Sequence, residues 1–130
     1  MIKYIKTNSN NINMKKIKIF GFIDLRYYNN LERECVNIAK KEGLSAKRAY
    51  ASNGKALGKS EQVDCLVEGY AVQAKMKKKI AQWLYPKYHA DDVDIVVTRM
   101  DRKEALAVIP YTEWIRLIKI EREYNDDRNK

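Results

Sequence analysis

The fold is decided by residues 63–75, VDCLVEGYAVQAK, in which two short apolar runs flank the dipeptide Glu68-Gly69. A two-residue connection ending in Gly between two such runs predicts a tight β-hairpin. With this turn, Val67 pairs with Tyr70, and successive side chains alternate between the two faces of the hairpin.

Polar side chains meet on one face of this predicted hairpin. Counting outward from the turn places Asp64 opposite Gln73, with Lys75 on the same face. The Cβ atoms of directly opposed residues lie roughly 4.5–5.5 Å apart. A carboxylate, an amide oxygen and an ammonium group are therefore expected in one small area, which suits Mg²⁺ because this ion prefers oxygen ligands. The same pattern also fits an ordinary surface hairpin whose polar residues face water.

A helix is predicted upstream of the hairpin, with Asn29 or Asn30 as its N-cap and an end near Glu42, where Gly43 stops it. Glu34 lies at the edge of the apolar stripe of this helix and is the candidate for a second carboxylate. A divalent ion held by two carboxylates polarises a phosphodiester and activates water, and a nearby ammonium group neutralises charge that develops on the phosphate.

The rest of the chain is predicted to alternate strands and short helices, which gives an α/β domain with a mixed central sheet flanked by helices. The expected strands are 15–25, 44–51, 93–100 and 105–109, and the expected helices are 76–84 and one capped by Thr112. Residues 1–13 read as a flexible polar leader, 14–124 as the domain and 125–130 as a polar tail. The residues expected in the core include Met76, Trp83, Met100 and Trp114.

The positive charge of the chain is concentrated in its first two thirds. The 130 residues carry a formal net charge of +9. Residues 1–90 hold 18 basic and 7 acidic side chains, whereas residues 91–130 hold 8 and 10. The excess favours a polyanionic partner, although charge runs also occur as solvated faces. The candidate DNA-binding residues are Lys47, Arg48, Lys55, Lys59, Lys77, Lys78 and Lys79.

The composition of the chain also indicates where in the cell the protein is found. No apolar stretch approaches 18 residues, and no apolar signal segment follows Met1, so the sequence predicts a cytoplasmic protein without membrane contact. The spacing of Cys35 and Cys65 matches neither a zinc site nor a disulfide scaffold. Many Lys, Ile and Asn residues hint at an AT-rich genome such as that of a phage or another mobile element.

The order of the polar residues resembles the signature of the PD-(D/E)XK nuclease superfamily, over roughly residues 30–120. The matching residues are Glu34, Val63-Asp64 and Gln73-Ala74-Lys75. More narrowly, the helix that opens with Leu31-Glu32-Arg33-Glu34, the basic pair Lys47-Arg48 and the Ser/Gly loop look like archaeal and phage Holliday-junction resolvases. Val63 departs from the usual Pro of this signature, and Gln73 departs from the usual Glu.

This resemblance implies a restriction-endonuclease-like core and a Mg²⁺-dependent DNA endonuclease of the Holliday-junction resolvase type, with Mn²⁺ able to substitute. It implies that Glu34, Asp64 and Gln73 bind the metal, that Lys75 is catalytic and that Ser52 lies near the scissile phosphate. Two cleavages of branched or duplex DNA imply a homodimer or a higher symmetric oligomer. Two alternatives remain: a sequence-specific homing or nicking endonuclease, and a DNA-binding module that Gln73 has left inactive.

Overall fold

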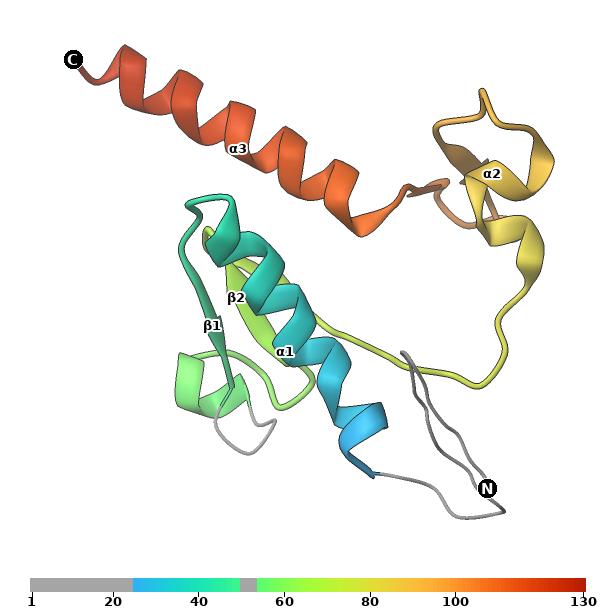
Figure 1. Cartoon of the computed structure of the whole chain (residues 1–130), viewed down its shortest axis with the longest axis horizontal. Coiled ribbons are helices and arrows are strands. Elements are labelled where there is room, and N and C mark those ends of the chain that lie inside the picture. Colours follow the sequence, from blue (N-terminus) through green and yellow to red (C-terminus); the bar gives the residue numbers. More distant parts are fainter. Residues whose placement is uncertain (1–24, 50–53) are drawn as a thin grey trace, which may run out of the picture. The chain divides into compact units, whose positions relative to one another are not determined.

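The computed structural model describes the backbone of residues 25–49 and 54–130, and the side chains of these ranges from residue 31 onward. The chain divides into two compact units, Met1–Arg33 and Glu34–Lys130. Helix α1 (Leu25–Lys41) begins in the first unit, and every other described element belongs to the second (Figure 1). The strand predicted for residues 15–25 lies outside the described residues except for Leu25, which is helical.

Helix α1 ends where the sequence predicts but begins earlier. Its first residue is Leu25, upstream of the asparagines expected as its N-cap. At its end, Gly43 has φ +81°, and its N–H donates to the Lys40 carbonyl at 2.9 Å. The Leu44 N–H donates to the Ala39 carbonyl at 3.0 Å. These two bonds form a Schellman motif, so the predicted glycine stop is confirmed.

The hairpin of residues 63–75 forms in the predicted register. The three antiparallel strands of its sheet are β1 (Ala46–Arg48), β2 (Cys65–Val67) and β3 (Tyr70–Val72), in the order β1-β2-β3. Val67 pairs with Tyr70. Glu68 and Gly69 have φ +47° and +84°, the positive values that a type I′ turn requires at both central positions.

The structure confirms an α/β domain, with two small sheets rather than one mixed sheet among the described residues. The second sheet is an antiparallel pair, β4 (Val96–Thr98) and β5 (Leu106–Val108). Among the described residues, β4 and β5 pair only with each other.

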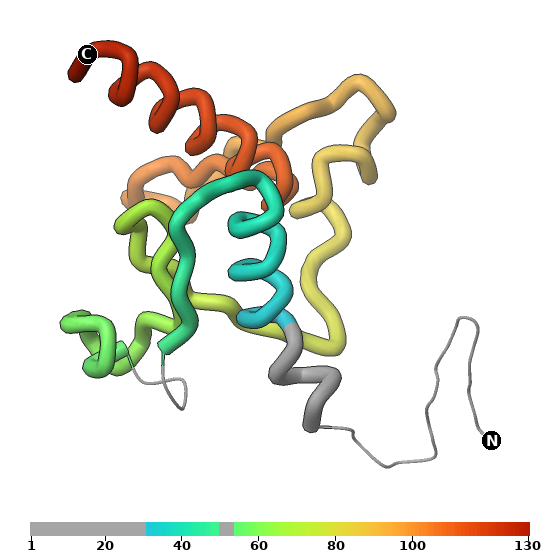
Figure 2. Tube along the Cα trace, turned by 60° about the vertical axis from the view of Figure 1, so that its left-hand side comes forward, coloured from blue at the N-terminus to red at the C-terminus, as the bar shows by residue number. Residues whose placement is uncertain are grey.

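Residues 73–81, which hold most of the predicted helix 76–84, contain no regular element and run on from β3 toward the next helical turns (Figure 2). These turns are η4 (Gln82–Leu84) and α2 (Pro86–His89), so Pro86 begins a helix instead of ending one. A helix this short is marginal in water. The prediction from apolar spacing was therefore wrong.

The last element is the helix α3 (Tyr111–Arg128), which continues through most of the predicted polar tail. Its N-cap is Pro110, so the cap predicted at Thr112 was wrong by two residues. Pro110 is an extended residue before the first helical turn. It has no backbone N–H, but an N–H at this position would have no partner within the helix. No helix in the described ranges is both long and apolar enough to cross a bilayer.

The core lies between one face of the three-stranded sheet and the helices α1 and α3. Its buried apolar residues are Cys35, Val36, Ala39, Leu44, Ala46, Ala49, Cys65, Val67, Ile115 and Ile118. Tyr70, which shares the face of Val67, makes an edge-to-face contact with Trp114 of α3 at 5.9 Å between ring centroids. The Tyr111 hydroxyl donates to the Cys35 carbonyl at 2.9 Å and thereby ties α3 to α1.

Tyr111→Phe should lower the stability of the domain by about 1 kcal/mol near neutral pH, because the Cys35 carbonyl loses its donor. Burial is the main cause that raises the pKa of Tyr111, and the nearby Cys35 and Cys65 raise it further. Above the ordinary tyrosine pKa of about 10, the unfolded state loses this proton first, so folding stability falls as the pH rises. Urea unfolding at neutral and alkaline pH should show a smaller alkaline loss for the variant than for the wild type. An equal loss in both proteins would contradict this assignment.

Candidate functional site

Asp64 occupies the centre of the candidate site, directly before the middle strand β2. Its backbone is bonded on both sides: its carbonyl accepts from the Ala49 N–H at 2.8 Å, and its N–H donates to the Val72 carbonyl at 2.9 Å. Its half-buried carboxylate accepts a hydrogen bond from the Ala74 N–H through Oδ2, at 2.7 Å. The backbone of the two neighbouring segments, at Ala49 and at residues 72–74, therefore fixes the position of this residue and its carboxylate.

The partners predicted for Asp64 lie in the segment that its carboxylate contacts. Strand pairing ends at Cys65 and Val72, so Asp64 and Gln73 are not a ladder pair as expected. The carboxylate instead bonds the residue between Gln73 and Lys75. The structure thus brings Asp64 to the Gln-Ala-Lys stretch, with a side chain to backbone bond in place of the predicted strand pair.

The Gln73 side chain is engaged with a residue that the sequence did not single out. Its Nε2 donates to Oε1 of Gln62 at 3.1 Å, and both residues are exposed. This bond uses the amide nitrogen, and Gln73 Oε1 accepts no hydrogen bond from any described residue. Lys75 is exposed and makes no ion pair within the part of the chain that the structure describes. An amide oxygen and an ammonium group therefore flank the contact made by Asp64.

Glu34 is exposed on α1, and no contact between described residues joins it to Asp64. The buried positions of this helix are Cys35, Val36 and Ala39. At 100° per residue, Glu34 lies well away from the centre of that stripe. Among the described residues, no three His, Cys, Asp or Glu side chains gather closely enough to hold a metal ion. The predicted metal ligands are two carboxylates and the amide of Gln73, so this finding does not test them. The assignment of Glu34 as a metal ligand stays a prediction.

The predicted DNA-binding side chains are exposed on several elements. Lys47 and Arg48 belong to β1, and Lys55 belongs to the 3-10 helix η3 (Gly54–Leu57). Lys55 forms an ion pair with Glu61 at 3.1 Å, and both side chains are about two-thirds exposed. The remaining exposed members are Lys59, Lys77, Lys78 and Lys79. Ser52, the residue expected near the scissile phosphate, lies outside the described residues.

Two residues expected in the core are on the surface instead. Trp83 is 45% exposed and Met100 is 70% exposed, so both predictions were wrong. Trp83 belongs to η4, which replaces the predicted amphipathic helix, and Met100 precedes the turn between the two strands of the small second sheet. Neither element is covered by a further layer of described residues, which explains the exposure. Met76 and Trp114 are half-buried.

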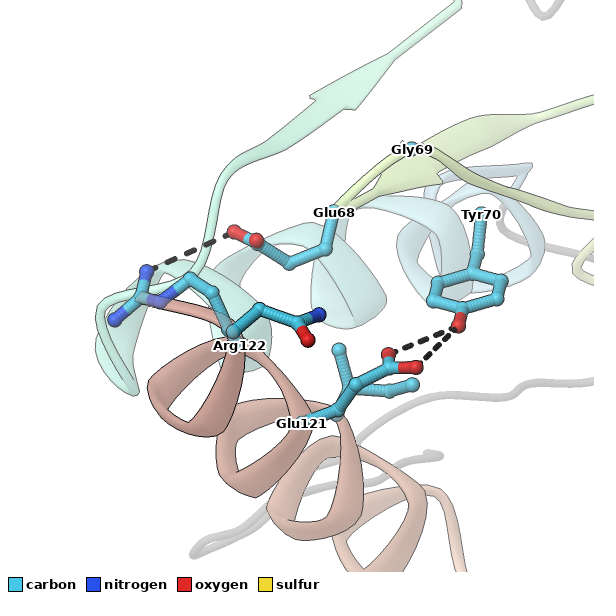
Figure 3. A pocket seen from close by; sticks show the side chains of 7 residues that line it. Glu68, Gly69, Tyr70, Glu121 and Arg122 are labelled. Atoms are coloured by element: carbon cyan, nitrogen blue, oxygen red, sulfur yellow. Dashed lines mark hydrogen bonds and ion pairs between the residues drawn. The ribbon is translucent and has the colours of Figure 1, made fainter. Parts of the chain in front are cut away.

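A pocket that the sequence did not reveal lies at the opposite end of the hairpin from Asp64. It has a volume of about 360 Å³. The residues that line it (Figure 3) are Glu68, Gly69, Tyr70, Ile118, Glu121, Arg122 and Asn125. Its turn residue Glu68 is four positions along an extended strand from Asp64, a span of about 13 Å. No sequence pattern predicted this pocket, because its two walls come from segments far apart in the chain.

The polar groups of this pocket bind one another. The Tyr70 hydroxyl donates to both oxygens of Glu121, at 2.9 and 3.2 Å, and this bond raises the pKa of Tyr70. Glu68 Oε2 accepts from the Ser45 N–H at 2.6 Å. Arg122 donates to the Gly43 carbonyl at 2.7 Å and lies 3.7 Å from Glu68 Oε2. These contacts hold α3 against the β2–β3 turn. The Nε of Arg122 is buried without a hydrogen-bond partner among the described residues and lies 3.8 Å from Asp126 Oδ2.

No family model, curated protein or solved structure matches this chain.

Proposed function

We propose that this protein is a metal-dependent DNA endonuclease that hydrolyses phosphodiester bonds. The observation that carries the proposal is the 2.7 Å bond between the Asp64 carboxylate and the Ala74 N–H. It places a fixed carboxylate beside the segment that supplies an amide oxygen from Gln73 and an ammonium group from Lys75. A carboxylate and an amide oxygen can bind a divalent ion that assists phosphodiester hydrolysis, and an ammonium group can neutralise charge on the phosphate.

The donor set fits Mg²⁺, with Mn²⁺ as a substitute, because every expected ligand atom is an oxygen. Asp64 keeps Oδ1 outside the bond to Ala74, and Gln73 keeps Oε1 outside the bond to Gln62. We expect Glu34 to supply the second carboxylate from α1. The bound ion would polarise the phosphodiester and lower the pKa of a water molecule. Lys75 would neutralise the charge that develops on the phosphate.

We propose that the order of elements is that of a restriction-endonuclease-like core. A helix carrying Glu34 precedes the basic strand β1, and the strand after Asp64 is followed by the strand before Lys75. This is the order in the Holliday-junction resolvases that the sequence resembles. The basic side chains of β1, Lys47 and Arg48, would contact the phosphates of the DNA backbone, which supply most of the affinity in such complexes.

The substrate class is tested by cleavage of a labelled four-way junction beside a linear duplex, each with Mg²⁺ and with EDTA. A resolvase is expected to cut the junction symmetrically and to leave the duplex intact. Cleavage of one long duplex sequence alone would favour a homing or nicking endonuclease. Absence of metal-dependent cleavage of every DNA tested would contradict the proposal.

The second candidate function is an inactive DNA-binding module, which the neutral Gln73 favours. An amide in place of a carboxylate removes one negative charge from the metal site and lowers its affinity for Mg²⁺. A binding module predicts DNA affinity that falls with salt concentration, without cleavage. Calorimetric titration with Mn²⁺ separates the two functions, since the enzyme is expected to release heat on binding the ion and the module is not.

We further propose that a second copy of the chain docks on α3, because two strand cleavages require two active sites. Leu117, Ile120 and Tyr124 are 45%, 50% and 60% exposed and follow one another at helical spacing. In an antiparallel helix pair centred on Ile120, the two Ile120 side chains would meet, and Leu117 and Tyr124 would extend the apolar contact on either side.

Ile120→Glu is expected to convert the dimer to a monomer, because two carboxylates would meet at the centre of the interface. Light scattering after size exclusion should give twice the mass of one chain for the wild type and the mass of one chain for the variant. Lys130→Glu, at the end of the chain and away from the stripe, is the matched control and should stay dimeric. A wild-type mass equal to one chain would refute the interface.

A further inference from the structure

A lysine-rich segment without regular structure leads directly into a group of exposed aromatic side chains. Lys77, Lys78 and Lys79 are all exposed and make no ion pair with any described residue. Three positive charges in succession repel one another. A partner with regularly spaced negative charges would relieve this repulsion. A chain of phosphates is such a partner.

The aromatic side chains follow within a few residues and leave large parts of their rings in water. Trp83 is 45% exposed, and Tyr85 and Tyr88 are each 58% exposed. Side chains of this kind supply the flat apolar surfaces on which nucleic-acid bases stack, and such stacking tolerates any base sequence. The segment therefore offers flat rings immediately beside its positive charges.

Several contacts order the backbone that carries these side chains, and one of them holds the Tyr88 ring. The ring Nε2 of His89 lies at hydrogen-bond distance, 2.9 Å, from the Trp83 carbonyl and so joins α2 to η4. The Tyr88 ring packs edge-to-face against His89, with 5.5 Å between the centroids. Pro86 is buried at the start of α2 and fixes the backbone between the tyrosines. An aromatic surface that is already ordered loses little conformational entropy when a ligand binds.

We propose that residues 77–88, the lysine-aromatic segment, bind single-stranded nucleic acid, with phosphates on the lysines and unpaired bases on the rings of Trp83, Tyr85 and Tyr88. A duplex keeps the faces of its bases inside the stack, so only a strand with unpaired bases uses both features. This inference rests on the proposed function in one respect. It states that the DNA bound by the nuclease contains an unpaired strand. Binding itself requires no metal.

The first test measures the fluorescence anisotropy of a labelled oligodeoxythymidine and of a blunt duplex of equal length, both in EDTA. The full chain should bind the single strand more tightly than the duplex. Trp83→Ala should weaken single-strand binding about tenfold and leave duplex binding nearly unchanged. Met100→Ala is the matched control, because Met100 is also a large apolar side chain that is mostly exposed, at 70%, but lies outside the lysine-aromatic segment. It should bind both ligands like the wild type.

The second test detects stacking without altering the lysine-aromatic segment. The chain has only two tryptophans, so Trp114→Phe leaves Trp83 as the sole indole. Oligodeoxythymidine should quench the Trp83 fluorescence in proportion to binding, because a base stacked on the indole ring quenches it. Binding without quenching would overturn the proposal, as would a Trp83→Ala variant that folds and keeps wild-type affinity for the single strand.

The two proposals fail separately. Single-strand binding that depends on Trp83, without cleavage in Mg²⁺, would support the stacking surface and refute the nuclease. Metal-dependent cleavage by a Trp83→Ala protein of unchanged single-strand affinity would support the nuclease and refute the surface. Loss of self-association in Trp83→Ala, with unchanged DNA binding, would show that the rings contact another copy of the chain and would also refute the surface.

Discussion

Asp64→Asn is expected to abolish metal-dependent DNA cleavage and to leave DNA binding intact. The substitution keeps a side-chain oxygen that accepts the hydrogen bond now made to Oδ2 by the Ala74 N–H at 2.7 Å, so the local fold should persist. It removes the negative charge that would hold the metal. Loss of the hydrogen-bond partner of a metal ligand costs 10–100-fold in activity, so loss of the charged ligand itself should cost about 100-fold or more.

The measurement is the initial rate of cleavage in Mg²⁺, together with DNA affinity in EDTA. Glu61→Gln is the matched control, because Glu61 lies three residues before Asp64, is exposed and pairs only with Lys55 among the described residues. Its rate should stay within about twofold of the wild type, since exposed ion pairs contribute little. An Asp64→Asn protein that cuts as fast as Glu61→Gln would show that Asp64 holds no metal.

Gly54→Ala is expected to destabilise the fold more than any other glycine substitution among the described residues. A Cβ at this buried position would overlap the Ser60 carbonyl oxygen and lie 2.8 Å from that of Val63. Both oxygens belong to the backbone, so the loop leading to Asp64 would have to move. Overpacking costs about 3 kcal/mol or more in such cases, which corresponds to a fall in Tm of about 10 °C.

Gly58→Ala, in the same loop, is the matched control for this substitution. Gly58 has φ +73°, and a Cβ there would meet no atom within 4 Å. The variant therefore incurs only the strain of a left-handed backbone, about 1 kcal/mol. Thermal unfolding followed by circular dichroism should place Gly54→Ala well below Gly58→Ala. Equal Tm values would contradict the close approach seen at Gly54.

The parts of the fold that the sequence predicted correctly depend on local rules. The two-residue turn at Glu68-Gly69 fixes the register of β2 and β3, because side chains alternate with a period of two. Gly43 ends α1 because it adopts a positive φ that other residues avoid. Each of these features is encoded within a few consecutive residues, so no knowledge of distant contacts was required.

The failures occur where a competing interaction outweighs the local pattern. Apolar spacing predicted a helix over 76–84, but a helix of this length is marginal in water unless tertiary packing stabilises it. The ladder was expected to reach Gln73, yet the Asp64 side chain bonds the Ala74 N–H, a local alternative to strand pairing. The bond between Tyr70 and Glu121 joins residues 51 positions apart, and no pattern in the sequence encodes that distance. The approach of Glu34 to Asp64 stays a prediction.

The most direct test of the proposed nuclease is cleavage of a labelled four-way junction by Lys75→Ala in Mg²⁺, beside the wild type and Lys103→Ala. Lys103 is the matched control, since it is an exposed lysine in the turn between β4 and β5, outside both proposed sites. The wild type and Lys103→Ala are predicted to give products that disappear in EDTA, and Lys75→Ala is predicted to give none. A wild type without metal-dependent products, or a Lys75→Ala protein that cuts at the wild-type rate, would contradict the proposed site.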